Sequence, residues 1–114
     1  MLKNKLKNLP ERGTLEIKEN IENNQIITIP VGATLIINFG IIFTNNMVIN
    51  NLGFLINQGI LKNNIDATIN NKFDAWIINK FIMTNYGTIN SKNYYSKIIN
   101  EGIINNNSIG IINN

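Results

Sequence analysis

Cysteine and histidine are both absent from this 114-residue chain, and it contains only two prolines and one tryptophan. Without cysteine the chain can form no disulfide and no thiolate metal site. Without histidine it lacks the commonest general base and metal ligand, which excludes Ser/His/Asp and Cys/His catalysis and ordinary zinc sites. We therefore expect no cofactor and no metal ion.

Long apolar runs are missing as well. No stretch reaches the ~18 consecutive apolar residues of a membrane-spanning helix, so we expect no membrane insertion. The segment from Met1 to Arg12 lacks the apolar region of a secretion signal. The hydrophobic content of 44% is nevertheless that of a globular protein, so the composition does not indicate disorder.

Charge of either sign is sparse. The net charge is +3, and the basic residues are thinly spread apart from Lys3, Lys5 and Lys7. A nucleic-acid surface would need aligned rows of lysine or arginine with aromatic residues among them. The sequence contains no such rows, so a nucleic-acid partner is not expected.

Asparagine and isoleucine dominate instead, at about 25 residues each. From Asn38 onward the pattern Asn-x-Gly-x-Ile/Leu recurs every six to eight residues, which is typical of a solenoid. Degenerate copies place Met47, Asp66 and Phe81 at the glycine position. The residues of the clear copies are Asn38, Gly40, Ile42, Asn51, Gly53, Leu55, Asn57, Gly59, Leu61, Asn85, Gly87, Ile89, Asn100, Gly102 and Ile104.

The repeat predicts short strands separated by tight corners. Side chains alternate between the faces of a strand, so the aliphatic residue two positions after each glycine is predicted to point inward. Asparagine suits corners and can stack into hydrogen-bonded ladders between coils. The predicted inward residues are Ile42, Ile49, Leu55, Leu61, Ile89 and Ile104.

Three strand-and-corner units make one triangular coil of about 19 to 21 residues. This stacks Gly40 on Gly59, and Met47 on Asp66 and then Gly87. We therefore predict an all-β parallel β-helix of about four to five coils. The irregular spacing favours a right-handed helix over the stricter left-handed hexapeptide form. A sandwich or small barrel is the alternative, disfavoured because the chain lacks Asn-Gly, Asp-Gly and Gly-Gly hairpin turns.

Residues 1–25 are predicted to cap the solenoid, and residues 26–114 to form its coils. The spacing of Leu2, Leu6 and Leu9 indicates a short helix ended by Pro10, and a strand follows at residues 14–18. Two segments, residues 72–76 and 91–97, interrupt the repeat. We interpret them as insertions at corners, which in solenoids gather on one face.

The segment Ile27-Thr28-Ile29-Pro30-Val31-Gly32-Ala33-Thr34-Leu35-Ile36-Ile37, followed by the Asn-x-Gly-x-Ile copies, carries a family resemblance. It resembles the opening coils of parallel β-helix proteins of the adhesin and haemagglutinin-like kind. It is also similar to the Asn/Ile-rich repeat proteins of giant viruses. The resemblance covers residues 26–114, and it implies a parallel β-helix at a virion or cell surface.

Three functions are compatible with the residues. The repeat runs to Gly110–Asn114 without a cap, which predicts a non-enzymatic structural protein, such as a fibre or virion component, that forms a trimer or an end-to-end homo-oligomer. Alternatively, an adhesin-like face binds a glycan or host protein. A third hypothesis pairs Asp66 with Asp74 for polysaccharide cleavage. The residues of the predicted binding face are Trp76, Tyr94, Tyr95, Lys92 and Lys97.

Overall fold

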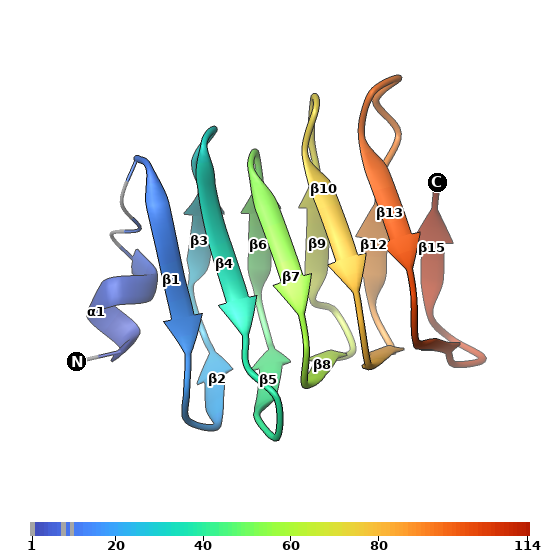
Figure 1. Cartoon of the computed structure of the whole chain (residues 1–114). Helices are drawn as coiled ribbons and strands as arrows, with labels where there is room; N and C mark the ends of the chain where they lie inside the picture. The colour runs from blue at the N-terminus through green and yellow to red at the C-terminus, as the bar shows by residue number, and fades with distance from the viewer. Residues whose placement is uncertain (1, 8, 10) are drawn as a thin grey trace.

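The computed structural model describes residues 2–7, 9 and 11–114, and it shows a parallel β-solenoid of five coils (Figure 1). Each coil adds one strand to each of three five-stranded sheets. Sheet A contains β1 (Gly13–Ile17), β4 (Ala33–Ile37), β7 (Phe54–Asn57), β10 (Trp76–Asn79) and β13 (Lys97–Asn100). Sheet B contains β2 (Ile21–Asn23), β5 (Ile42–Asn45), β8 (Ile60–Asn63), β11 (Ile82–Asn85) and β14 (Ile103–Asn106). Sheet C contains β3 (Ile26–Ile29), β6 (Val48–Asn51), β9 (Thr68–Asn71), β12 (Thr88–Asn90) and β15 (Ile111–Asn113).

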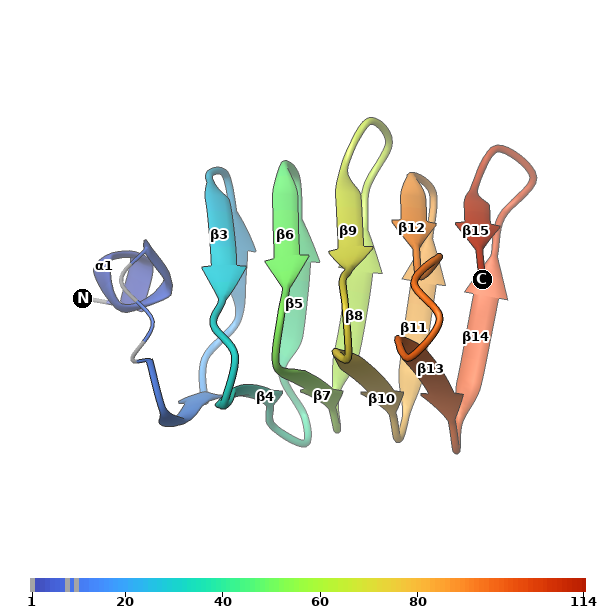
Figure 2. The ribbon, with the colours of Figure 1, turned by 90° about the horizontal axis from the view of Figure 1, so that it is seen from above.

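Every strand pair in the three sheets is parallel, which confirms the predicted solenoid and shows that the sandwich or barrel alternative is wrong. The coils wind in the right-handed sense as they advance from the N-terminal to the C-terminal end (Figures 1 and 2). Stacked asparagines are 18 to 23 residues apart, a wider range than the predicted coil length.

The core is a column of aliphatic side chains, because alternate residues of each strand point inward. Four of the predicted inward residues are fully buried, and Ile104 is partly buried against the same core. The prediction for Ile42 is wrong, since 38% of its surface is exposed while Phe43 lies in the core. The four fully buried residues are Ile49, Leu55, Leu61 and Ile89.

The phase error at Ile42 comes from a longer corner. Asn38 opens a four-residue turn closed by a hydrogen bond from the Ile41 N–H to the Asn38 carbonyl, at 3.1 Å, with Gly40 at a φ of 82°. The extra residues move β5 by one position relative to the prediction. Ile42 therefore pairs with Ile60, and the residue that stacks on Gly59 is Ile41 rather than Gly40.

The same kind of turn shifts the degenerate copy around Asp66. The Ala67 N–H donates to the Asn64 carbonyl at 3.0 Å, and Asp66 has a φ of 67°. Ala67 therefore stacks on Gly87, where the sequence predicted Asp66.

A short helix, α1 (Leu2–Lys7), covers the first coil (Figure 1). Leu6 is fully buried in the core that the helix covers. The predicted ends of this helix, at Met1 and Pro10, lie outside the described residues, as does the side chain of Leu2. The strands β1 and β2 pair with β4 and β5, so the first coil begins at Gly13 and the boundary at residue 25 falls inside the solenoid.

Asparagines form ladders at the three inner corners, where they are buried except in the last coil, in which Asn100 and Asn106 are exposed. In the longest ladder the side-chain amide of each asparagine donates to the side-chain oxygen of the next, at 2.9 Å in every step. A second ladder follows sheet A and a third follows sheet C, where Ser91 replaces asparagine. The longest ladder contains Asn23, Asn45, Asn63, Asn85 and Asn106.

Each ladder asparagine also satisfies the backbone of its corner. The Asn57 Nδ2 donates to Asn79 Oδ1 at 2.8 Å and to the Ile82 carbonyl at 2.7 Å. Its Oδ1 accepts from the Gly59 N–H at 3.2 Å, which closes the turn locally. The Asn-x-Gly motif therefore supplies hydrogen-bond partners to backbone groups at the corners, where hydrogen bonding between strands is interrupted.

The glycine of the motif is required by the close approach of two coils. A Cβ at Gly87 would overlap the carbonyl oxygens of Ala67 and Asn64. Gly40 lies in the longer turn, where a Cβ would meet no atom within 4 Å and only the positive φ resists substitution. Gly87 is thus fixed by packing, and Gly40 by backbone conformation.

We expect Gly87→Ala to lower the free energy of unfolding by more than about 2 kcal/mol, because backbone of two coils must separate. Gly40→Ala should cost about 1 kcal/mol, the strain of a left-handed alanine. Urea unfolding followed by circular dichroism measures both. Equal losses would contradict the packing argument.

We expect Asn57→Ala to lower the free energy of unfolding by about 3 kcal/mol or more, because the Gly59 N–H and the Ile82 carbonyl would stay buried without this partner. The matched control is Asn70→Ala in the half-exposed outer ladder, where water can replace the lost bonds to Asn50 and Asn90. The control should cost less than about 1 kcal/mol. A loss at Asn70 as large as at Asn57 would show that burial is not the cause.

Candidate functional site

The outer faces of the three sheets differ in chemistry. On sheet A, one outward row is almost entirely isoleucine and the neighbouring row holds Phe54 and Trp76. On sheet C, the corresponding row is an asparagine ladder from Asn50 to Asn113. We define the apolar face as Ile36, Ile56, Ile78, Ile99, Phe54 and Trp76.

The apolar face is half-exposed along its length. Its four isoleucines and Trp76 are intermediate in burial, and 39% of Phe54 is exposed. The Phe54 and Trp76 rings meet edge to face, with centroids 6.0 Å apart. Contiguous apolar surface of this kind marks an interaction site more often than scattered apolar residues do.

The predicted binding residues gather at the corner between sheets C and A. Both interruptions of the repeat, residues 72–75 and 91–96, are connections at this corner, as expected for solenoid insertions. Trp76, Tyr95 and Lys97 line a shallow hollow of about 310 Å³ together with Asp74. The Lys97 Nζ lies 5.2 Å from the centre of the Trp76 ring, a cation–π contact.

The remaining members of the predicted group lie beside this hollow. Tyr94 is 91% exposed, and its ring meets the Tyr95 ring at 4.7 Å in an edge-to-face arrangement. Lys92 is exposed in the same connection between β12 and β13. The structure therefore brings Trp76, Tyr95 and Lys97 together and leaves Tyr94 and Lys92 at the edge.

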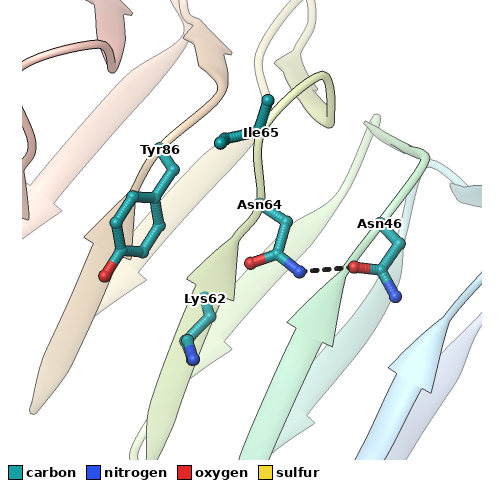
Figure 3. Close-up of a pocket in the computed structure, with 5 residues that line it drawn as sticks. All are labelled: Asn46, Lys62, Asn64, Ile65 and Tyr86. Carbon is teal, nitrogen blue, oxygen red and sulfur yellow. Dashed lines mark hydrogen bonds between the residues drawn. The ribbon is translucent and has the colours of Figure 1, made fainter.

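A second groove, which sequence reasoning missed, lies at the corner between sheets B and C (Figure 3). It has a volume of about 470 Å³ and is lined by Asn46, Lys62, Asn64, Ile65 and Tyr86. The groove is hidden in the sequence because the four-residue turn at Asp66 displaces the alignment of neighbouring coils by one residue. In the correct register Tyr86 stands where the neighbouring coil has Asn64.

The two aspartates proposed as a catalytic pair are not brought together. Asp66 lies in the turn before β9 and Asp74 in the turn after it, so the length of the strand separates them. Among the described residues, no three acidic side chains form a group that could hold a metal ion. The predicted pairing of Asp66 with Asp74 is therefore not formed.

The last coil is less covered than the first. Ile98, Ile104 and Ile112 occupy core positions but are only partly buried, whereas their counterparts in the middle coils are fully buried. The strands β13, β14 and β15 are paired on one side only. This end of the described chain is a second apolar surface.

Comparison of the chain with protein-family models, with curated proteins and with solved structures gives no match. Within the part of the chain that the structure describes, no helix has the length and apolar character needed to cross a membrane. The fold is thus that of a parallel β-solenoid, and any function must be argued from the surfaces themselves.

Proposed function

We propose that the protein is a non-enzymatic structural module, of the kind used in fibres or at virion or cell surfaces, that self-associates through the apolar face. The observation that supports this proposal is the continuous row of half-exposed isoleucines on sheet A, from Ile36 to Ile99. Burial of a flat apolar sheet face against a matching face makes the free energy of association more favourable, because apolar surface is removed from water.

A second copy of the same chain fits this face. The outward row that contains the isoleucines begins with Glu16 on β1, and Lys97 lies on the outer side of β13 at the opposite edge. When two copies pack face to face in antiparallel orientation, β1 of one copy lies against β13 of the other. Glu16 then approaches the oppositely charged Lys97, and Ile56 lies at the centre of the interface.

The size of the face predicts weak association. Five strands spaced about 4.8 Å apart, each about 13 Å long, make a flat area of roughly 300 Å². A standard stable interface buries about 800 Å² on each partner. The pair should therefore form only at high protein concentration, or where many copies are held together.

Absolute mass from light scattering over a concentration series tests the proposal. The mass should rise from the 12.9 kDa of one chain toward twice that value as the concentration increases. Ile56→Lys should keep the protein monomeric, because it puts two like charges at the centre of the pair. Thr68→Lys is the matched control on the outer face of sheet C, and it should associate like the parent protein.

Two other results are informative. A mass that grows beyond two chains and is insensitive to Ile56→Lys would place the contact at the last coil rather than on the apolar face. A constant monomer mass at the highest concentration reached would contradict self-association altogether.

The hollow at Trp76 and Tyr95 favours a second candidate function, a contact for a glycan or a protein. Lys97 and Phe54 already occupy positions on the Trp76 ring, which leaves less ring surface for a sugar and favours a protein partner. Tyr95→Ala should then abolish partner binding without changing the thermal unfolding temperature. Retained binding measured by surface plasmon resonance would remove this candidate.

A further inference from the structure

An outer ladder of asparagines runs along the corner between sheets B and C and stops at the groove of Figure 3. The Asn46 Nδ2 donates to Asn24 Oδ1 at 2.8 Å, and the Asn64 Nδ2 donates to Asn46 Oδ1 at 2.6 Å. These bonds run toward the N-terminal coil, so each asparagine oxygen faces the next coil. The position that would continue the ladder is occupied by Tyr86.

Tyr86 leaves the side-chain oxygen of the last asparagine in this ladder, Asn64, without a donor from the next coil. The bond to Asn46 fixes the Asn64 amide plane, and Figure 3 shows the Asn64 oxygen turned toward the Tyr86 side of the groove. No described residue donates a hydrogen bond to this oxygen. The groove therefore contains an acceptor that is already oriented, which lowers the entropy cost of binding a donor.

The other walls of the groove supply a cation and an apolar surface. Lys62 projects from the outer face of β8 between Thr44 and Thr84, and it is half-buried. Among the described residues the one ion pair joins Lys18 and Glu16, so Lys62 has no acidic partner there. The half-buried Tyr86 ring and Ile65 supply the apolar surface.

We propose that this groove binds an acidic sugar residue, a uronic acid unit of an oligosaccharide. A ring hydroxyl donates to Asn64 Oδ1, the carboxylate pairs with the Lys62 ammonium, and the C–H face of the sugar packs against the Tyr86 ring. The groove lies at the corner of sheets B and C, away from the apolar face of sheet A. The proposal is therefore independent of self-association.

The test is a titration of the ¹⁵N-labelled protein with a galacturonic acid oligosaccharide, followed by NMR. The backbone signals of Ile65 and Tyr86 and the side-chain amide signals of Asn46 and Asn64 should shift together. An open groove with three contacts should give a Kd of about 1 mM. A neutral galactose oligosaccharide of the same length should bind about two- to fivefold more weakly, because it lacks the charge that Lys62 recognises.

Two variants separate binding from folding. Tyr86→Asn restores at this position the residue found at Asn64 and Asn107 in the adjacent coils, so it should extend the ladder and keep or raise the thermal unfolding temperature. The same change should weaken binding of the acidic oligosaccharide by about tenfold or more, because it removes the ring and fills the acceptor. Lys62→Thr, which matches Thr44 and Thr84, should reduce the acidic oligosaccharide to the affinity of the neutral one.

The matched control is Phe39→Ala, which removes an exposed aromatic ring from the corner between sheets A and B and should leave the titration unchanged. The proposal is overturned if the oligosaccharide causes no shifts at 20-fold its expected Kd, or if Tyr86→Asn binds as the parent protein does. It is also overturned if a glutamate-rich peptide binds more tightly than the oligosaccharide, since a peptide would then be the preferred partner.

Discussion

The buried amide ladder is the interaction on which the rest of the structure depends. A triangular solenoid must turn three times in each coil, and at each turn backbone groups face the core without a strand partner. An unpaired buried N–H or carbonyl costs about 1–3 kcal/mol, so three unpaired corners in each of five coils would exceed the stability of a small domain. At the end of a strand, an asparagine side chain provides two N–H donors and one acceptor oxygen. These groups hydrogen-bond to the backbone of the same turn, to the backbone of the next coil and to the asparagine stacked on it. Where an asparagine belongs to a ladder, it also fixes where its strand ends, so that corners of different length can be accommodated between the same strands. In the first coils Ile17, Ile29 and Ile37 take this position instead.

The role of asparagine at the corners explains which parts of the fold could be predicted from the sequence. The spacing of Asn51-Leu52-Gly53 and Asn57-Gln58-Gly59 predicts the parallel solenoid, because both members of each motif have a direct physical role: the asparagine closes the turn and the glycine permits the close approach of coils. The same reasoning fails at Asn38 and Asp66, where a four-residue turn replaces the two-residue corner and the local pattern still reads Asn-x-Gly or Asn-x-Asp. The length of a corner depends on the register set by the coil below, and that information is not local in the sequence.

The candidate surfaces were less predictable for a related reason. Trp76, Tyr95 and Lys97 could be grouped from the sequence because all three lie in the two predicted interruptions of the repeat. Tyr95 and Lys97 belong to residues 91–97, and Trp76 ends residues 72–76. The apolar face could not, because its isoleucines are 20 to 22 residues apart and share the composition of the core residues beside them. The groove at Tyr86 depends on a one-residue alignment between coils. The candidate surfaces of this fold are formed by such outward rows, whereas the inward rows form the core and the ladders.

Hydrogen exchange of the asparagine side-chain amides, measured by NMR on the folded protein, tests the central claim most directly. If the buried ladders hold the coils together, the side-chain NH₂ protons of Asn45, Asn63 and Asn85 exchange only through global unfolding, at the rate of the slowest backbone amides. Those of the half-exposed Asn70 and Asn90 exchange orders of magnitude faster. Fast exchange at Asn45, Asn63 and Asn85 would contradict the account, because it would mean that the ladders open while the solenoid stays folded.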